Sequence, residues 1–245
     1  MSRNLIWWST GAASAVMAWL VLKEEPDSLI VRCETANEDP DNYRFEADVM
    51  KYLDRSITLL KSDEFESVRD VWKRERYMAG INGASCTRAM KVEPRLAFQR
   101  PTDRHAFGYT NDRVDIDRYT RLRANYPELE VRAILIEQGI DKANCLGIVE
   151  RWGIALPRSY AMGFPNANCL QTGCVKGGLS YWSRYRFYFP VQFAATAAQA
   201  REIGARLVKY KGKRIFIDEI PADYPMTDPI VPACDFLCSA MEAAE

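Results

Sequence analysis

The chain has 245 residues, of which 48% are hydrophobic and 27% are charged. This composition excludes a disordered chain, and the length allows one large domain or one domain with a small addition. Thirty-three basic residues balance thirty-three acidic ones, so no overall field draws the chain to nucleic acid, although a local basic groove stays open. His105 is the only histidine, which excludes a metal site built from two or three histidines of one chain.

Residues 5–22 form an apolar stretch that has two interpretations. The stretch carries no charge, is just long enough to span a bilayer, and lies between Arg3 and Lys23, as in a signal anchor. Its centre, however, is Ser-Thr-Gly-Ala-Ala-Ser, which is weakly apolar and typical of a turn. A strand, a turn and a helix explain the same residues, so we expect a cytoplasmic protein without a membrane span.

Strand and helix patterns alternate over the first sixty residues. Short apolar runs typical of buried strands occupy Asn4–Trp8, Leu29–Cys33 and Ser56–Leu60. Helical spacing separates them at Ala12–Lys23 and Phe45–Leu53. This order predicts an α/β fold with a Rossmann-like parallel sheet, helices on both faces, and ligand-binding loops at the edge where the strands end.

The later part of the chain continues this pattern and then changes character. Further predicted elements are strands at 106–109, 131–136 and 214–218, and helices at 141–152, with Asp141 as N-cap, and at 195–209. Between residues 157 and 190 the chain is rich in Gly, Asn, Cys and aromatic residues, which is typical of loops that carry a site. We therefore predict a nucleotide-binding core at 1–155, with a loop-rich, cysteine-containing segment, a helix and a C-terminal tail at 156–245 packed on it.

The turn after the first strand has the composition of a phosphate-binding loop. Small side chains let backbone N–H groups approach an anion, the following helix contributes its positive N-terminus, and hydroxyl groups add donors. The loop is neither a Walker A loop nor a GxGxxG motif, and a plain small-residue turn explains it as well. The candidate nucleotide-binding residues in this loop are Ser9, Thr10, Gly11, Ala12, Ala13 and Ser14.

Motifs in the same order along nearly the whole chain resemble one family. They are WWSTGAASAVMAWL at 7–20, NEDPDNYRF at 37–45, GASCTRAMK at 83–91, GYTND at 108–112, LPRSYAMGFPNANCLQTGCVKGG at 156–178 and PACDFLC at 232–238. The chain is similar to the phosphoadenosine phosphosulfate (PAPS) reductase-like branch, found in phage and bacterial genomes, of the adenine nucleotide alpha-hydrolase-like (PP-loop) superfamily. The resemblance implies an enzyme that binds an adenine nucleotide, PAPS or ATP, at the carboxyl edge of a parallel sheet.

The loop departs from the superfamily pattern at two positions. The usual PP-loop sequence is SGGxDS, whereas here Ala13 replaces the Asp and Thr10 replaces the first Gly. The missing carboxylate disfavours Mg-dependent ATP cleavage and favours a PAPS reductase-like oxidoreductase, since sulfonucleotide reductases tolerate loops without that Asp. The alternatives are an ATP-dependent adenylating enzyme or sulfur transferase that modifies a nucleic acid or small molecule, and an inactive nucleotide-binding module.

The resemblance also implies partners. A reductase takes a nucleotide substrate and a thiol reductant protein, whereas an adenylating enzyme can take a nucleic acid substrate. A homodimer is the candidate assembly.

Four cysteines are candidate ligands of a metal. Thiolates suit zinc or an iron–sulfur cluster, and relatives that transfer sulfur favour a [4Fe-4S] cluster. The alternative is that several are small buried packing residues, which is our interpretation of Cys33. The candidate set is Cys86, Cys145, Cys169 and Cys174.

The C-terminal pair Cys234 and Cys238 has a separate interpretation. Sulfonucleotide reductases end in a mobile cysteine that attacks the sulfur of the bound nucleotide, which makes these two residues the candidate catalytic thiols. Their flanks differ from the E-C-G-[IL]-H tail of those enzymes. The alternative is a docked tail that contributes a cysteine to the metal set.

Other polar residues are candidates for contacts with the nucleotide. Asn37 and Glu38, with Asp39 and Asp41, follow the second strand, where a ribose or metal contact is expected, although such a loop is often only solvated. Lys91 and Arg118 match basic positions of the family and are candidates for binding phosphate or sulfate. Lys176 precedes two glycines and can close a loop over an anion. We also considered base stacking on aromatic residues, which as a cluster more often form core: Tyr160, Tyr181 and Trp182.

Overall fold

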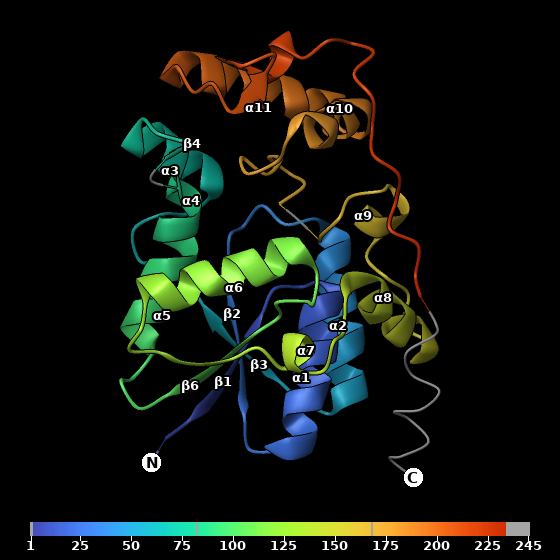
Figure 1. Ribbon diagram of the computed structural model, residues 1–245. Helices are drawn as coiled ribbons and strands as arrows, with labels where there is room; N and C mark the ends of the chain where they lie inside the picture. Colours follow the sequence, from blue (N-terminus) through green and yellow to red (C-terminus); the bar gives the residue numbers. More distant parts are fainter. Residues whose placement is uncertain (1, 82, 168, 234–245) are drawn as a thin grey trace.

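The computed structural model describes residues 2–81, 83–167 and 169–233, and its centre is a five-stranded parallel sheet (Figure 1). The strands are β1 (Asn4–Trp8), β2 (Leu29–Cys33), β3 (Ile57–Leu60), β6 (Arg104–Phe107) and β7 (Glu130–Arg132), in the order β3-β2-β1-β6-β7. The predicted Rossmann-like parallel sheet is therefore confirmed. Cys234 and Cys238 lie outside the described residues.

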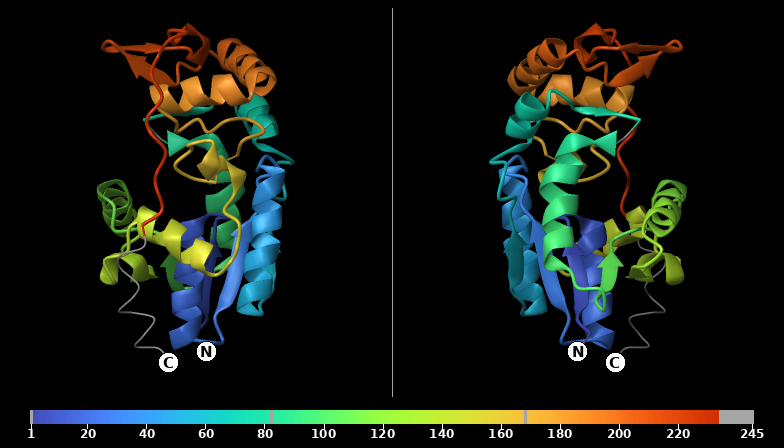
Figure 2. Two further views of the ribbon diagram at one scale, coloured as in Figure 1. Left: turned by 90° about the vertical axis from the view of Figure 1, so that its right-hand side faces the viewer. Right: turned by 90° about the vertical axis from the view of Figure 1, so that its left-hand side faces the viewer.

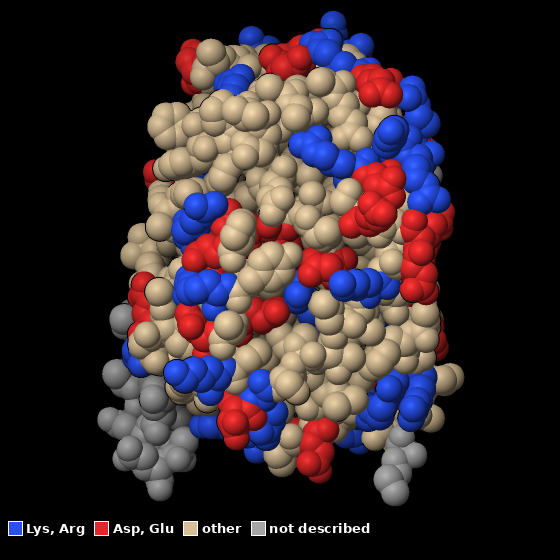
Figure 3. Space-filling view, turned by 180° about the vertical axis from the view of Figure 1, so that it is seen from behind, with Lys and Arg blue, Asp and Glu red and all other residues tan. Residues whose placement is uncertain are grey.

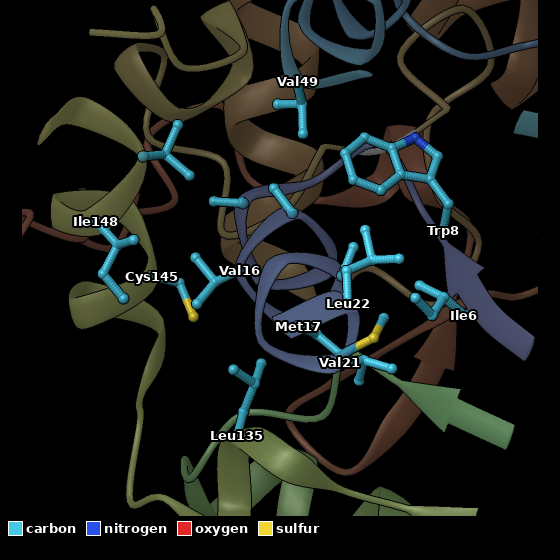
Figure 4. Close-up of a cluster of buried hydrophobic side chains, with 14 of the residues drawn as sticks. Ile6, Trp8, Val16, Met17, Val21, Leu22, Val49, Leu135, Cys145 and Ile148 are labelled. Carbon is cyan, nitrogen blue, oxygen red and sulfur yellow. The ribbon is translucent and has the colours of Figure 1, made fainter. Parts of the chain in front are cut away.

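Side chains of β1 alternate between two buried faces of the sheet. Ile6 and Trp8 point into one hydrophobic cluster, whereas Leu5 and Trp7 point into another. The first cluster is covered by α1 (Ala12–Glu24), α2 (Pro40–Leu53), α7 (Ile134–Glu137) and α8 (Lys142–Arg151), part of which Figure 4 shows. Phe98, from α5 (Glu93–Phe98), packs on the second cluster. Burial on both faces explains why β1 and β2 are continuous apolar runs.

The apolar stretch at residues 5–22 forms a strand, a turn and a helix. It comprises most of β1, the small-residue loop and most of α1, which is 13 residues long. Over the described ranges, no helix is long and apolar enough to cross a membrane.

A second layer lies beyond the carboxyl ends of the strands (Figures 1 and 2). Its hydrophobic cluster combines residues 65–90 with residues 164–220, on either side of the predicted boundary at 155. Trp182 and Tyr185 are fully buried within it. Its elements are α3 (Val68–Glu75), β4 (Ala79–Gly80), β5 (Gly83–Ala84), α4 (Ser85–Thr87), α10 (Leu179–Tyr188), α11 (Pro190–Ile203), β8 (Val208–Tyr210), β9 (Lys213–Ile215) and the 3-10 helix η2 (Ile217–Glu219). The second layer covers the edge of the sheet where ligands bind in α/β folds.

Several predicted elements have different bounds in the structure. The strand predicted at 106–109 is β6, two residues earlier, and the helix predicted at Phe45–Leu53 already begins at Pro40. The strand predicted at 131–136 divides into β7 and α7, because Ile134 and Leu135 are fully buried in the core cluster that packs on α1. The helix predicted at 195–209 starts at Pro190 and ends at Ile203, since Gly204 adopts a left-handed backbone with φ 82° that terminates it. The strand predicted at 214–218 overlaps the end of β9 and the start of the 3-10 helix η2.

The last described residues run from the second layer back to α8 (Figure 1). Arg186 donates to the carbonyl oxygens of Ile220 and Pro221 at 2.8 and 2.7 Å. At the end of the segment, the Ala233 N–H donates to the Ala143 carbonyl at 3.0 Å. The backbone approaches α8 so closely here that a Cβ on Gly147 would lie 2.1 Å from the Ala233 oxygen. The described part of the tail therefore contacts the second layer at one end and α8 at the other.

Asp103 anchors the start of the chain to β6, and this contact predicts a pH dependence. Its buried carboxylate accepts hydrogen bonds from Arg3 Nη2 at 2.6 Å and from the Arg100 N–H at 2.8 Å. Burial alone raises the pKa of Asp103, but these hydrogen bonds bring it below its ordinary value. Because the unfolded chain then binds more protons, the stabilisation is present above about pH 4 and is lost as pH falls below it.

We therefore expect Asp103→Asn to lower the free energy of unfolding at pH 7 by about 1–3 kcal/mol, the cost of disrupting a buried charge-assisted hydrogen bond. Urea unfolding between pH 3 and pH 7 measures this difference. The free energy of unfolding of the variant should fall less steeply toward low pH than that of the wild type. Asp117→Asn is the control, since the ion pair of Asp117 with Arg113 lies on the exposed surface. Equal effects of the two substitutions would contradict the role given to Asp103.

Candidate nucleotide-binding site

The loop between β1 and α1 presents its backbone N–H groups to hydroxyl oxygens. Ser14 Oγ accepts from the N–H groups of Ser9 and Gly11, each at 3.3 Å. The Ala12 N–H donates to the Tyr160 hydroxyl at 3.2 Å. These neutral oxygens lie at the start of a helix, where an anion is stabilised by the helix dipole and by free N–H groups.

Thr10 has a strained backbone that its neighbours hold in place. Its φ is 57°, in the left-handed region that glycine favours. Its hydroxyl donates to Glu38 Oε2 at 2.5 Å, and also contacts the Ser9 carbonyl oxygen at 2.7 Å. Glu38 is buried and also accepts from Asn42 Nδ2 at 3.3 Å. The left-handed backbone of Thr10 is therefore held by a contact with the loop after β2.

A small cationic cavity adjoins this loop. It has a volume of about 150 Å³ and is lined by Ser9, Gly11, Ala13, Gly108, Tyr109, Asp115, Arg118, Lys142, Tyr160, Asn166 and Ala167. Arg118 forms an ion pair with Asp115 at 2.8 Å, and Lys142 Nζ donates to Asn166 Oδ1 at 2.7 Å. Burial lowers the pKa of Lys142, although Asp115 partly opposes this. With two cations and helix N–H groups, the cavity is chemically suited to phosphate or sulfate.

Gly108 allows the end of β6 to lie directly against the start of α1. A Cβ at this position would lie 3.1 Å from the Ser14 nitrogen and 3.2 Å from the Ala13 carbonyl carbon, both backbone atoms. The loop that follows is fixed by Thr110, whose hydroxyl contacts Asp112 at 2.7 Å and Asp115 at 2.8 Å. The GYTND motif therefore shapes one wall of the cationic cavity.

A larger aromatic cavity of about 380 Å³ lies next to the cationic one. The two share Ser9, Gly108 and Tyr109. The residues that line the aromatic cavity are Trp7, Trp8, Ser9, Cys33, Glu38, Thr87, Lys91, Val92, Arg95, Phe107, Gly108, Tyr109, Leu122 and Tyr126. Aromatic and aliphatic walls with a few polar groups are typical of small-molecule sites, and a flat heterocycle suits them by stacking.

A third cavity, of about 180 Å³, connects to the aromatic one through Glu38, Thr87 and Lys91. The other residues that line it belong to the second layer or to loops between that layer and the sheet. They are Thr35, Val68, Trp72, Cys86, Ala167, Cys169, Gly173, Cys174, Val175 and Lys176. We call it the cysteine cavity. The three cavities are neighbours along the carboxyl ends of β1, β2 and β6, since the cationic and the cysteine cavity each share lining residues with the aromatic one.

Lys91 lies where the aromatic and cysteine cavities meet. It belongs to a π-helical segment, η1 (Arg88–Val92), between α4 and α5. Such segments are rare and are frequent at functional sites. Burial lowers the pKa of Lys91, but nearby groups that are negative when ionised, Glu38 among them, together raise it by more, so the pKa lies above its ordinary value. Lys91 is therefore cationic at neutral pH.

The acidic loop after β2 has mainly structural contacts. Asn37 Oδ1 accepts from the Val68 N–H at 2.7 Å and thereby caps α3. Asp39 is buried and forms an ion pair with Arg158 at 2.7 Å, on the short helix α9 (Arg158–Ala161). Asp41 accepts from Arg44 and from the Arg158 N–H. Of the loop residues predicted to contact a ligand, only Glu38 lines a cavity described above.

The structure does not bring the four candidate metal ligands together. Cys86, Cys169 and Cys174 line the cysteine cavity. Cys145, in contrast, belongs to α8, is fully buried, and faces Val16 of α1 (Figure 4). Within the part of the chain that the structure describes, no three His, Cys, Asp or Glu residues are placed to hold a metal ion. The arrangement therefore does not fit the predicted four-cysteine site, because α8 carries Cys145 into the hydrophobic core.

Burial makes the thiols of Cys169 and Cys86 poor nucleophiles. It raises the pKa of Cys169 to about 12, despite an opposing effect of Lys91, and it raises the pKa of Cys86 as well. An ordinary cysteine has a pKa of about 8.5, so the thiolate fraction of Cys169 at pH 8 is roughly a thousandfold smaller.

We expect iodoacetamide at pH 8 to alkylate Cys169 at least about 100 times more slowly than a cysteine in a peptide, because only the thiolate reacts. Mass spectrometry of tryptic peptides over time gives this rate. The same protein in urea is the control and should react at the peptide rate. Rapid labelling of Cys169 in the folded protein would contradict the protonated state.

Some candidate residues line the cavities, others have a different role, and two cavity residues were not predicted. Tyr181 and Trp182 belong to the core of the second layer, whereas Tyr160 contacts the loop at Ala12. Ser9, Ala13 and Arg118 line the cationic cavity, and Lys91 and Lys176 line the cysteine cavity. Lys142 and Arg95 were not predicted, although Lys142 follows the predicted N-cap Asp141 and thus begins a helix at the ligand-binding edge.

Comparisons with known proteins name no relative. No protein-family model and no curated protein matches the chain. The family resemblance therefore rests on the sequence motifs alone.

The distribution of charge on one face bears on nucleic acid binding. The face opposite that of Figure 1 carries Lys and Arg interspersed with Asp and Glu among its described residues, rather than one basic stripe (Figure 3). Such a face has no continuous basic groove to follow a nucleic acid backbone.

Proposed function

We propose that the chain is a cytoplasmic, adenine-nucleotide-binding enzyme of the PAPS reductase-like class, acting on a sulfonucleotide. The observation that carries the proposal is the pair of cavities at the ends of the strands: a cationic one at the start of α1 and an aromatic one, joined by Ser9, Gly108 and Tyr109. A nucleotide joins an anionic phosphate to a flat base through a ribose. The phosphate suits the cationic cavity, and the base suits the neighbouring aromatic cavity. The position at the carboxyl edge of a parallel sheet supports the same assignment.

The cationic cavity supports a sulfonucleotide over ATP with magnesium. Of the described residues that line it, Asp115 is the only acidic one, and its carboxylate already accepts from Thr110 and Arg118. A magnesium ion prefers carboxylate oxygens that are available to it. Ala13, which stands in place of the PP-loop Asp, also lines this cavity.

The proposed chemistry uses a thiolate and a reductant protein. The thiolate attacks the sulfur of the phosphosulfate, the sulfur–oxygen bond to phosphate breaks, and the nucleotide phosphate leaves. A dithiol reductant then attacks the cysteine sulfur, sulfite leaves, and the resulting mixed disulfide is resolved by the second thiol of the reductant. Cys234 and Cys238 are the candidate nucleophiles, and support comes from Ala233, which contacts Ala143 directly beside Lys142 of the cationic cavity.

Thermal unfolding with three ligands tests the proposal. The protein is heated with PAPS, with ATP and Mg²⁺, or with AMP at equal excess, where a ligand at 100 times its Kd adds about 2.7 kcal/mol of stability. We expect PAPS to raise the melting temperature by several degrees. We also expect the protein to release sulfite from PAPS in a thiol-dependent reaction, which Cys234→Ser or Cys238→Ser abolishes. A shift with ATP and Mg²⁺ alone would replace the proposal with an adenylating enzyme, and the absence of any shift would refute a nucleotide site.

A further inference from the structure

The hairpin of β8 and β9 carries a cluster of cations. Residues 206–214, RLVKYKGKR, contain five basic residues and no acidic one, although the chain as a whole has no net charge. Figure 2 shows this hairpin, in dark orange, at the upper end of the second layer and away from the central sheet. We call residues 206–214 the cationic hairpin. Its basic residues are all exposed, and they are Arg206, Lys209, Lys211, Lys213 and Arg214.

The fold anchors the cationic hairpin at its base and exposes its tip. Val208 and Ile215 are opposite each other at the base, and both pack on the hydrophobic cluster of the second layer. The turn at the other end consists of Lys211 and Gly212, whose φ angles are 44° and 82°, as in the tight type I′ turn of a hairpin. Asparagine, aspartate or glycine is usual at the first of these positions. A lysine there places a charge at the tip at a conformational cost.

Carboxylates of the protein do not neutralise these cations. Among the described residues, none of the five basic side chains of the cationic hairpin forms an ion pair. The acids that follow the hairpin, Asp218 and Glu219, pair with Arg201 instead. Within the hairpin, Lys209 lies directly opposite Arg214, and like charges in such a cross-strand pair destabilise it. An external polyanion would remove this repulsion.

We propose that the cationic hairpin binds double-stranded DNA, a function separate from the one proposed for the nucleotide site. The major groove of B-form DNA is about 12 Å wide and 8.5 Å deep, and it admits a two-stranded β-ribbon. With three residues in each strand, the hairpin is about 10 Å long, so its tip fits the depth of that groove. The major groove of duplex RNA is too narrow for it. Lysines contact phosphates as point charges, so this binding does not depend on the base sequence.

Fluorescence anisotropy with a labelled DNA duplex of about 20 base pairs tests this role between about 50 and 200 mM salt. The first variant combines Lys209→Gln, Lys211→Gln and Lys213→Gln. Each phosphate contact contributes about 0.9 to the slope of log binding constant against log salt concentration. We therefore expect this variant to lose about 2–3 from the slope and to bind at least about tenfold more weakly at low salt.

A control variant removes the same charge from exposed positions outside the second layer. It combines Lys23→Gln, Lys51→Gln and Lys61→Gln, and it should leave both the affinity for DNA and the salt slope nearly unchanged. Exposed substitutions of this kind change stability little, so both variants should melt as the wild type does. The hairpin variant should also bind AMP as the wild type does, because residues 206–214 line none of the three cavities.

Absence of binding to the duplex at low salt would overturn the inference, and the lysines would then serve only to keep the hairpin edges from pairing with other chains. Equal weakening by the two variants would overturn it as well, because the attraction would then come from net charge. Tighter binding to an RNA duplex of the same sequence, or to vesicles that contain phosphatidylserine, would assign the hairpin to another polyanion. All these outcomes leave the proposed nucleotide site untouched, since the AMP titration tests that site separately.

Discussion

Gly108→Val is expected to weaken nucleotide binding at least tenfold and to lower the free energy of unfolding by about 1–3 kcal/mol, as overpacking does. The first added carbon would already lie 3.1 Å from the Ser14 nitrogen and 3.2 Å from the Ser14 Cα. Backbone atoms cannot rotate away as a side chain can, so the start of α1 must shift. That shift displaces the N–H groups that face the cationic cavity.

Urea unfolding and nucleotide titration measure the two effects of Gly108→Val separately. Gly178→Val is the matched control, because nothing lies within 4 Å of a Cβ at that exposed glycine, and its φ of −83° suits any residue. If Gly108→Val bound nucleotide as tightly as the control variant does, the close approach of β6 and α1 would not be needed for the site.

Lys142→Met is expected to weaken binding of AMP about tenfold to hundredfold while leaving binding of adenosine unchanged, since only the phosphate loses a charged contact. Lys142 is half-buried beside the start of α1, and its ammonium group donates to Asn166 at 2.7 Å. Methionine preserves the length of the side chain and its apolar contacts, so the fold should be retained.

Calorimetry with AMP and with adenosine distinguishes the charge of Lys142 from other effects. Lys51→Met, on the exposed side of α2, is the control and should change neither affinity. Equal weakening of AMP and adenosine binding by Lys142→Met would contradict a phosphate contact and would indicate a distorted site.

The sheet was predictable because its strands carry a strong local signal. Asn4–Trp8 and Leu29–Cys33 are continuous apolar runs, and the structure buries them on both faces. Ile134 and Leu135 gave the same apolar signal but form a helical turn, since a short apolar run does not distinguish a strand from a buried helix. The end of α11 at Gly204 was missed although glycine after a helix is a common terminator.

The candidate site was only partly predictable, because it combines residues from distant segments. The loop Ser9–Ser14 could be proposed from the sequence because a phosphate-binding loop depends on local backbone geometry. Asn37 and Asp39 were predicted as ligand contacts, but their polar atoms cap α3 and bind Arg158. Arg95 gave no local signal, because only the folded chain brings it to the wall of the aromatic cavity.

Backbone amide chemical shifts, measured while isotope-labelled protein is titrated with AMP and then with adenosine, test the central claim most directly. If the phosphate binds at the start of α1, the amides of Gly11, Ala12 and Ala13 should shift strongly with AMP and only weakly with adenosine. Amides around Phe107 and Tyr126 should shift with both, because the base enters the aromatic cavity. Shifts from AMP that spare Gly11–Ala13 would contradict a phosphate site in this loop.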